Sequence, residues 1–189
     1  MKTDTIFYDL FQQFPSFFFE LLNQPPQAAD QYHFSSVEVK QLAFRIDGVF
    51  LPNPEATEQP IYFVEVQFQG DEELYARFFS EIFLYLRQTN RINDWRGVLL
   101  YPRRSTDIGE TTRYQELFDS GRVTRLYLNE LAESQSIGLT LFQIIIANER
   151  KAINQGRDLI EQIRDQIDDQ QQQQKLLQLL ETILVYKLP

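Results

Sequence analysis

Two acidic residues stand inside strongly apolar runs, where a carboxylate is hard to bury. Asp47 follows Ile46, and Glu65 lies between Val64 and Val66. A charge among such neighbours is costly unless a partner or a cation compensates it. Two carboxylates on adjacent strands make the hard oxygen site that Mg²⁺ or Mn²⁺ prefers, and the backbone carbonyl of Val66 is a candidate further ligand.

Gln67 comes two residues after Glu65, and because side chains alternate along a strand both point to the same face. Each acid also has an ordinary interpretation. Asp47 precedes Gly48, as a turn residue would, and Glu65 could pair with Arg45 across the strands. We favour a metal site over a structural ion-pair cluster, because both acids occur together with Gln67 and a following amphipathic helix.

The elements that must position these residues follow from the spacing of apolar side chains. Residues 3–23 show helical spacing around Pro15, which predicts two short helices. Alternating or β-branched runs predict strands at residues 36–40, 43–51, 61–68, 95–101 and 123–128.

A long amphipathic helix is expected between the third and fourth strands. Its first turn begins with the acids Asp71–Glu73, which the helix dipole favours, and Leu74, Phe78 and Ile82 continue its apolar face. A strand, a long helix and another strand form a crossover, so part of the sheet should be parallel. The expected fold class is therefore α/β, with a core over residues 1–147.

The sequence from Ile137 onward is helical. Residues 139–147 are apolar enough to close the core, and residues 148–189 form a helical extension. Its heptad-like apolar positions flank the run Gln170–Gln174 and are Ile153, Ile160, Ile163, Ile167, Leu176, Leu177, Leu180, Ile183 and Leu184. We favour a helical hairpin or a dimerisation arm over a flexible linker, and expect a homodimer formed through these helices.

The composition restricts the class of protein. The 189 residues are 43% hydrophobic and 24% charged, which is typical of a folded chain. Cysteine is absent, which excludes disulfides and thiolate metal sites and suits a cytoplasmic protein. The apolar runs are too short to span a bilayer, so no membrane association is expected. The single histidine, His33, argues against a zinc hydrolase.

The net charge of −9 argues against DNA binding by charge alone. One stretch, residues 86–104, is nevertheless basic. It contains Arg87, Arg91, Arg96, Arg103 and Arg104 against one acid, Asp94. These arginines could face phosphate groups or could equally be solvated side chains.

Asp47 together with the motif Glu65-Val66-Gln67 resembles the PD-(D/E)XK nuclease superfamily. The sequence is most similar to recombination-promoting nucleases of the Rpn type, which are also classed as transposases, and among them to an uncharacterised cyanobacterial branch. The runs SVEVKQ, FRIDGVF, YFVEVQF and EIFLYL, which begin at residues 36, 44, 62 and 81, carry this likeness. It covers roughly the first three quarters of the chain.

The resemblance implies an early helix packed on a mixed central sheet, and hydrolysis of DNA phosphodiesters by a metal-activated water. On this template Asp47 and Glu65 ligate the metal, which lowers the pKa of water and stabilises the charge of the transition state. Either Glu20 or Glu38 could complete the site. Arg77 and Tyr85 could contact phosphate or serve in packing and capping.

Gln67 stands where many members of the superfamily have lysine. Lysine can orient water and offset negative charge, whereas glutamine only hydrogen-bonds. Glutamine is common at this place in the Rpn branch, so the change does not by itself imply an inactive enzyme. The leading hypothesis is a Mg²⁺-dependent DNA endonuclease. The alternative is a non-catalytic interaction module on the nuclease scaffold, which the acidic charge, the missing lysine and the C-terminal apolar seam favour.

Overall fold

The computed structural model describes residues 3–39, 44–132 and 134–187, without the side chains of residues 3–4, 37–39 and 44–47. The chain forms two compact units, Met1–Tyr127 and Leu128–Pro189. The division comes after Tyr127 and not after Ala147, where the sequence analysis placed it.

The first unit is built on one five-stranded sheet of order β1-β2-β3-β4-β5. Its strands are β1 (Tyr32–Val39), β2 (Phe44–Pro52), β3 (Ile61–Val66), β4 (Trp95–Tyr101) and β5 (Val123–Tyr127). β1, β2 and β3 are antiparallel neighbours, whereas β4 is parallel to both β3 and β5. The sheet is mixed, as the expected crossover requires.

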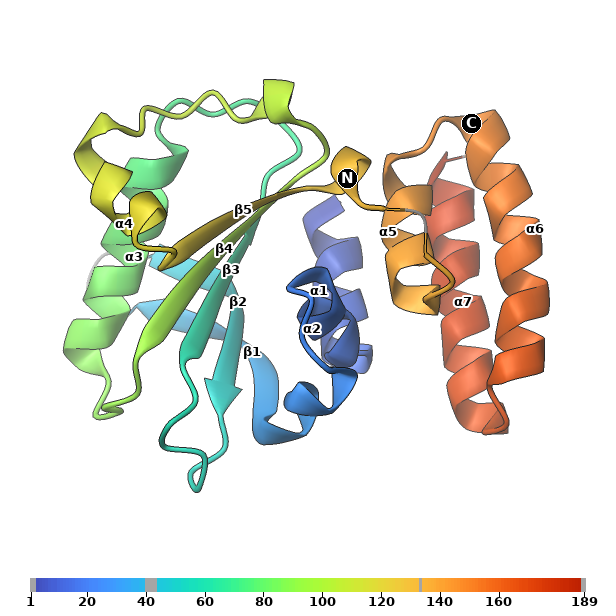
Figure 1. The fold of residues 1–189 in the computed structure, drawn as a ribbon, viewed down its shortest axis with the longest axis horizontal. Helices are drawn as coiled ribbons and strands as arrows, with labels where there is room; N and C mark the ends of the chain where they lie inside the picture. The colour runs from blue at the N-terminus through green and yellow to red at the C-terminus, as the bar shows by residue number, and fades with distance from the viewer. Residues whose placement is uncertain (1–2, 40–43, 133, 188–189) are drawn as a thin grey trace. The chain divides into compact units, whose positions relative to one another are not determined.

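Helices cover both faces of this sheet (Figure 1). One face carries α1 (Thr3–Gln13) and α2 (Ser16–Leu21), and the other carries α3 (Leu74–Gln88) and α4 (Gln115–Asp119). The connections contain the short 3₁₀ helices η1 (Pro26–Gln31), η2 (Arg104–Thr106) and η3 (Thr112–Tyr114). Pro15 immediately precedes α2 and separates it from α1, as predicted.

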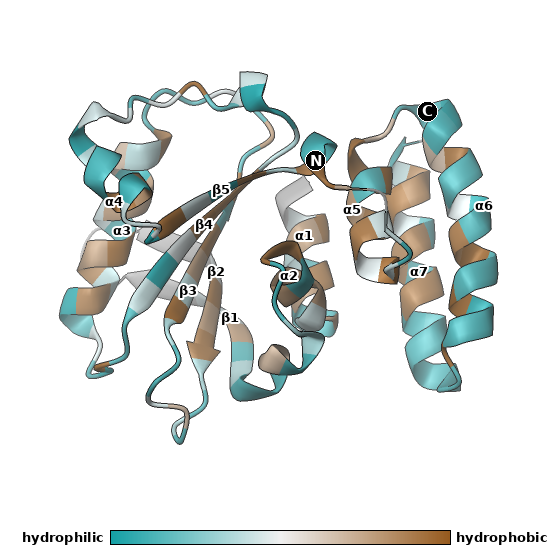
Figure 2. Cartoon of the chain, in the orientation of Figure 1, coloured by the Kyte–Doolittle hydropathy of each residue, from teal (hydrophilic) through white to brown (hydrophobic). Residues whose placement is uncertain are grey.

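Strands β3 and β4 are buried along most of their length, because both faces of the sheet are covered, and Figure 2 shows hydrophobic residues along the sheet. On the face toward α2, Phe18 stacks on Phe50 with ring centroids 4.2 Å apart. On the face toward α3, Phe63 lies in a cluster with Phe78 and Leu99, all less than 2% exposed. Burying each such side chain contributes about 1.5–3 kcal/mol, so the sheet holds two aromatic layers in place.

The end of β2 that carries Asp47 approaches β3 closely. Gly48 pairs with Val64, and a Cβ added to Gly48 would lie 2.9 Å from the backbone oxygen of Val64. A glycine at this position lets the two strands come together beside Glu65.

The second unit begins with η4 (Leu128–Glu130) and continues with helices α5 (Ile137–Ile146), α6 (Glu149–Gln166) and α7 (Gln170–Lys187). α5 packs against both α6 and α7. A helix that is apolar on nearly all sides can be buried in either unit, so its composition alone did not decide where it belongs.

Helices α6 and α7 form the expected hairpin, and the glutamine run begins α7. The side chain of Asp169 accepts a hydrogen bond from the backbone N–H of Gln172 at 2.8 Å, which caps the helix. Ile163, Leu176, Leu180 and Ile183 of the predicted seam are buried, but the first turns of α6 differ from the prediction. Ala152 and Gly156 are buried, whereas Ile153 is 39% exposed. Small residues allow a close approach, and Leu184 packs directly on Gly156. The sequence analysis considered only large apolar side chains, so it placed isoleucines in the seam and missed the small residues.

Candidate functional site

Glu65 lies in a row of residues that crosses the sheet on the face toward α3. Its register partner in β4 is Leu99, whose partner in β5 is Arg125. On the other side, β2 pairs Gly48 with Val64, so one further step of this antiparallel register sets the backbone of Asp47 opposite Glu65. The two predicted acids therefore occupy neighbouring strand positions, although the side chain of Asp47 lies outside the described part of the chain.

Arg77, near the start of α3, reaches the carboxylate of Glu65. Its Nη2 lies 3.2 Å from Glu65 Oε1, and its Nη1 lies 2.6 Å from Asp71 Oδ2. The other carboxylate oxygen of Asp71 accepts a hydrogen bond from the backbone N–H of Glu73 at 2.9 Å. Asp71 thus closes a turn just before α3, whose N-cap residue is Glu73, and Arg77 links that turn to β3.

These contacts alter two titrations. The hydrogen bond from Arg77 lowers the pKa of Asp71 below its ordinary value. Partial burial lowers the pKa of Arg77, but its hydrogen bonds and charge interactions with Asp71 and Glu65 outweigh that effect, so its pKa is raised. Both groups are therefore ionised at neutral pH.

We predict that Asp71→Asn lowers the free energy of unfolding by roughly 0.5–1 kcal/mol at neutral pH, because the variant weakens the ion pair with Arg77 and the hydrogen bond from the Glu73 N–H. The folded pKa of Asp71 is depressed. Its contribution is therefore complete above the ordinary unfolded pKa of about 3.9 and is lost as pH falls through the lower folded value. Urea unfolding over decreasing pH should show the two proteins converging in acid. A constant difference at every pH would contradict this origin.

Gln67 lies one residue beyond the end of β3 and not inside the strand as predicted. Its backbone N–H donates to the carbonyl oxygen of Leu100 at 2.8 Å, which extends the pairing with β4. Its side-chain Nε2 donates to the carbonyl oxygen of Gln69 at 2.5 Å. The Gln67 side chain is partly buried, and its amide is held by the loop that leads into α3.

Of the other candidates, Glu20 and Tyr85 lie apart from this pair, whereas Val66 adjoins Glu65. Glu20 belongs to α2, which packs on the opposite face of the sheet, where Phe18 meets Tyr62. Tyr85 is 8% exposed, and its ring packs on Phe63 with centroids 5.3 Å apart, so its role is packing. Val66 follows Glu65 at the end of β3.

The side chains of Glu38 and Arg45, two predicted partners of the site, lie outside the part of the chain that the structure describes. Glu38 is paired with Arg45 in the backbone register of β1 and β2. The described ion-pair partner of Glu65 is Arg77, and the side chain of Arg45, the alternative considered from the sequence, is likewise not described.

The basic stretch is divided between the two ends of β4. Arg103 and Arg104 follow the strand at the end where Glu65 lies, whereas Arg87, Arg91 and Arg96 lie toward its beginning. Because seven residues of strand extend about 23 Å, the five arginines form no continuous surface. A regular helix or strand carries residues that are close in sequence far apart in space. The sequence analysis counted the charges of this stretch without considering that separation.

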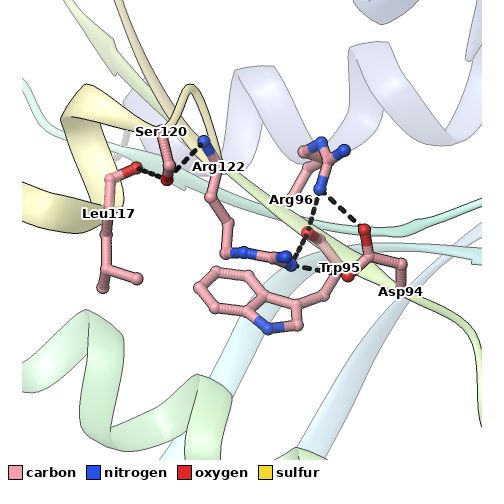
Figure 3. A network of polar contacts seen from close by, with 6 residues as sticks. All are labelled: Asp94, Trp95, Arg96, Leu117, Ser120 and Arg122. Atoms are coloured by element: carbon pink, nitrogen blue, oxygen red, sulfur yellow. Dashed lines mark hydrogen bonds and ion pairs between the residues drawn. The ribbon is translucent and has the colours of Figure 1, made fainter.

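Arg96 and Arg91 have protein partners at that distant end. Arg96 Nη1 donates to Asp94 Oδ2 at 2.9 Å, and Arg122 donates to the other oxygen of Asp94 at 2.5 Å (Figure 3). The Arg122 guanidinium also lies over the Trp95 ring, 5.1 Å from its centroid. Arg91 Nη1 donates to the carbonyl oxygen of Pro52 at 2.9 Å. These contacts give Arg91 and Arg96 structural roles.

A polar cluster that the sequence did not reveal lies at the carboxyl ends of β4 and β5. Asp107, whose side chain is 6% exposed, accepts hydrogen bonds from Tyr75 at 2.5 Å, from Tyr127 at 2.7 Å and from Arg125 at 3.3 Å. Tyr101 donates to the Tyr75 hydroxyl at 3.1 Å. Burial, followed by the bond to Asp107, raises the pKa of Tyr75 and of Tyr127 to about 12. Asp107 comes from an irregular loop, and no periodicity pointed to it.

The donors around Glu65 suit a hard divalent cation chemically, because they are oxygens. Within the described part of the chain, no group of three or more acidic, histidine or cysteine side chains is arranged to hold a metal ion. A metal at this position would therefore need the carboxylate of Asp47. Of the helices that the structure describes, none has the combination of length and hydrophobicity that crossing a membrane requires.

Comparisons with known proteins give one result. One protein-family model matches residues 3–189 and is described as "Protein of unknown function (DUF2887)". Neither the curated proteins nor the solved structures contain a match to the chain.

Proposed function

The chain belongs to the DUF2887 family of proteins of unknown function, and from its site we propose that it is a metal-dependent DNA endonuclease. One observation carries this proposal. Gly48 of β2 pairs with Val64 of β3, and continuing this antiparallel register by one step would bring Asp47 opposite Glu65, near the end of the sheet where α3 begins. Two acids there form the nucleus of an oxygen-ligand site for Mg²⁺ or Mn²⁺.

The fold supports the same proposal. Two early helices pack on a mixed sheet, which is the arrangement that the resemblance to PD-(D/E)XK nucleases of the Rpn type implies. Asp47, Glu65 and the carbonyl of Val66 would hold the ion. When bound, a divalent ion supplies a water of lowered pKa and stabilises the charge that develops on the attacked phosphate.

Arg77 provides the positive charge that Gln67 lacks. Its guanidinium contacts Glu65 directly and is held in place by Asp71. A cation in this position offsets negative charge when a phosphate group approaches the acids. Gln67, fixed by the loop carbonyl of Gln69, contributes hydrogen bonding but no charge.

The test is a plasmid-nicking assay of the wild type and of Asp47→Asn in Mg²⁺, in Mn²⁺ and in EDTA. The wild type should nick only with metal, and the variant should not nick. Glu58→Gln removes the same charge from an exposed loop residue and should behave as the wild type. Wild-type protein that binds no metal and nicks no DNA would refute the proposal.

Thermal melting with Mn²⁺ provides a measurement of the site that does not depend on catalysis. Metal that binds only the folded protein stabilises it by about 2.7 kcal/mol at a hundred times its Kd. The wild-type midpoint should rise, and that of Asp47→Asn should not.

A non-catalytic interaction module is the second candidate, and the ion pair between Glu65 and Arg77 favours it. Arg77 already compensates this carboxylate without a metal. The C-terminal seam no longer supports the module, because its buried side chains pack between α6 and α7 of the same chain. The homodimer likewise remains only a proposal. Absence of both a metal-dependent melt and nicking would favour the module.

A further inference from the structure

A pocket of about 600 Å³ lies within the second unit, between α5, α6 and the segment that begins at η4. All of its described lining residues belong to this unit, and none of them is a residue of the candidate metal site. Leu128 and Leu159, each 1% exposed, contribute to its apolar wall. Its volume is in the range of pockets that bind small molecules.

One buried polar atom in the wall of this pocket lacks a hydrogen-bond partner. Gln155 of α6 lines the pocket, and its side-chain oxygen Oε1 is hidden from solvent and accepts no hydrogen bond within the described part of the chain. Folded proteins rarely leave such an acceptor unpaired, because it has given up its bond to water. A ligand that is seated against Gln155 and brings an N–H donor would restore the missing bond.

Two further glutamines of the pocket present acceptors to a ligand. Gln143 Nε2 donates to the carbonyl oxygen of Ala132 at 3.2 Å. Gln162 Nε2 donates to the carbonyl oxygen of Gln135. A carbonyl oxygen can only accept, so these bonds fix which end of each amide is the nitrogen. The amide oxygens of Gln143 and Gln162 are left for other donors, and the pocket therefore favours a ligand that is rich in N–H groups.

Two opposite charges line the pocket along α6. Lys151 and Asp158 are both exposed, with Gln155 between them in sequence. Neither has an ion-pair partner among the residues that the structure describes. Seven residues of helix rise by roughly 10 Å, so the two charges face separate ends of a ligand. Asp158 suits a cationic end, and Lys151 suits an anionic end.

We propose that this pocket binds a small zwitterion that carries a guanidinium group, with the size and chemistry of free arginine. A guanidinium has five N–H donors in one plane, so it can bond to Gln155 Oε1 and to the Asp158 carboxylate together. The carboxylate of the ligand pairs with Lys151. This binding site is separate from the proposed nuclease site, and its test does not depend on nicking.

The test is isothermal titration calorimetry of the full chain with three probes at neutral pH. L-Arginine should bind saturably, with one site per chain. Agmatine lacks the carboxylate and should bind roughly threefold more weakly, because an exposed lysine contributes little to an ion pair. L-Citrulline has a neutral group in place of the guanidinium and should bind more than about tenfold more weakly.

Variants of the three α6 residues separate their roles. Gln155→Leu and Asp158→Asn should each weaken the binding of L-arginine roughly three- to tenfold. Lys151→Gln should weaken the binding of L-arginine to the level of agmatine and leave the binding of agmatine unchanged. The thermal midpoint of unliganded Gln155→Leu should not fall, because the variant removes an unpaired buried acceptor. A residue with a purely structural role would lower that midpoint when replaced.

Asp165→Asn is the matched control, because it removes the same charge from an exposed residue of α6 that does not line the pocket. It should bind L-arginine as the wild type does. The assignment would be overturned by a wild type without saturable binding, by equal affinity for arginine and citrulline, or by an equal loss in Asp165→Asn. Wild-type affinity in folded Gln155→Leu and Asp158→Asn would also overturn it. Asp158 is exposed, so its variant decides the question even if Gln155→Leu does not fold.

Discussion

Glu65→Gln is expected to reduce the rate of metal-dependent DNA nicking by roughly a thousandfold, which corresponds to about 4 kcal/mol of transition-state stabilisation. The amide keeps the shape of the side chain but removes one of the two negative charges that would hold the divalent ion. The fold should persist. Glu65 is partly exposed, and Arg77 retains its bond to Asp71 at 2.6 Å, so the cost in stability should stay below about 1 kcal/mol.

The measurements for this variant separate chemistry from binding. Nicking rates at saturating DNA report the loss of catalysis, and anisotropy with Ca²⁺ reports the affinity for DNA. The affinity for DNA should change much less than the nicking rate. Glu116→Gln, an exposed acid on α4, is the control for the change of charge. Full activity in Glu65→Gln would show that the observed cleavage arises elsewhere.

The sheet and its flanking helices could be predicted because burial on two faces leaves a strong pattern. The strand around Phe63 and the helix around Phe78 were found from their apolar residues. The expectation that Asp47 and Glu65 occupy adjacent strands agrees with the backbone register. Two strand boundaries differ from the prediction. Gln67 lies after the end of β3, and β1 begins at Tyr32, four residues before the predicted start.

Contacts made by irregular segments could not be predicted in the same way. Asp107 lies in a loop, and its partners Tyr75 and Tyr127 come from α3 and β5. Their proximity depends on how the loop folds back over the sheet. The spacing of residues in the sequence does not predict such a fold. The ion pair of Glu65 with Arg77 has the same character, because it depends on the angle at which α3 leaves β3.

Asp107 anchors the loop that follows β4 to the rest of the α/β unit. It draws donors from α3 and from β5, and Gly109 in the same loop packs so closely on the Tyr75 ring that a Cβ would lie 2.6 Å from it. The loop carries Arg104, and Asp107 itself holds Arg125. The positions of both arginines therefore depend on this one buried carboxylate.

We expect Asp107→Ala to lower the free energy of unfolding by about 3–5 kcal/mol. The substitution removes the counter-ion of the partly buried Arg125 and the acceptor of two tyrosine hydroxyls. Asp107→Asn, which fills the same space, should cost less, about 2 kcal/mol. Asp119→Asn, an exposed acid on α4, should cost under about 0.5 kcal/mol. Urea unfolding at neutral pH measures all three. Equal stabilities of the wild type and Asp107→Ala would show that the cluster does not hold the loop.

The tyrosines of this cluster offer a second readout, which a simple loss of packing would not reproduce. Burial and the bond to Asp107 raise the pKa of Tyr75 to about 12 in the folded wild type. A raised folded pKa stabilises the protein fully below the unfolded tyrosine value of about 10 and loses this effect as pH rises through the folded value. In Asp107→Asn the tyrosines should ionise at lower pH, as followed by ultraviolet absorbance, and the alkaline loss of stability should begin earlier. An unchanged tyrosine titration would mean that burial alone sets these pKa values and that Asp107 contributes only its packing.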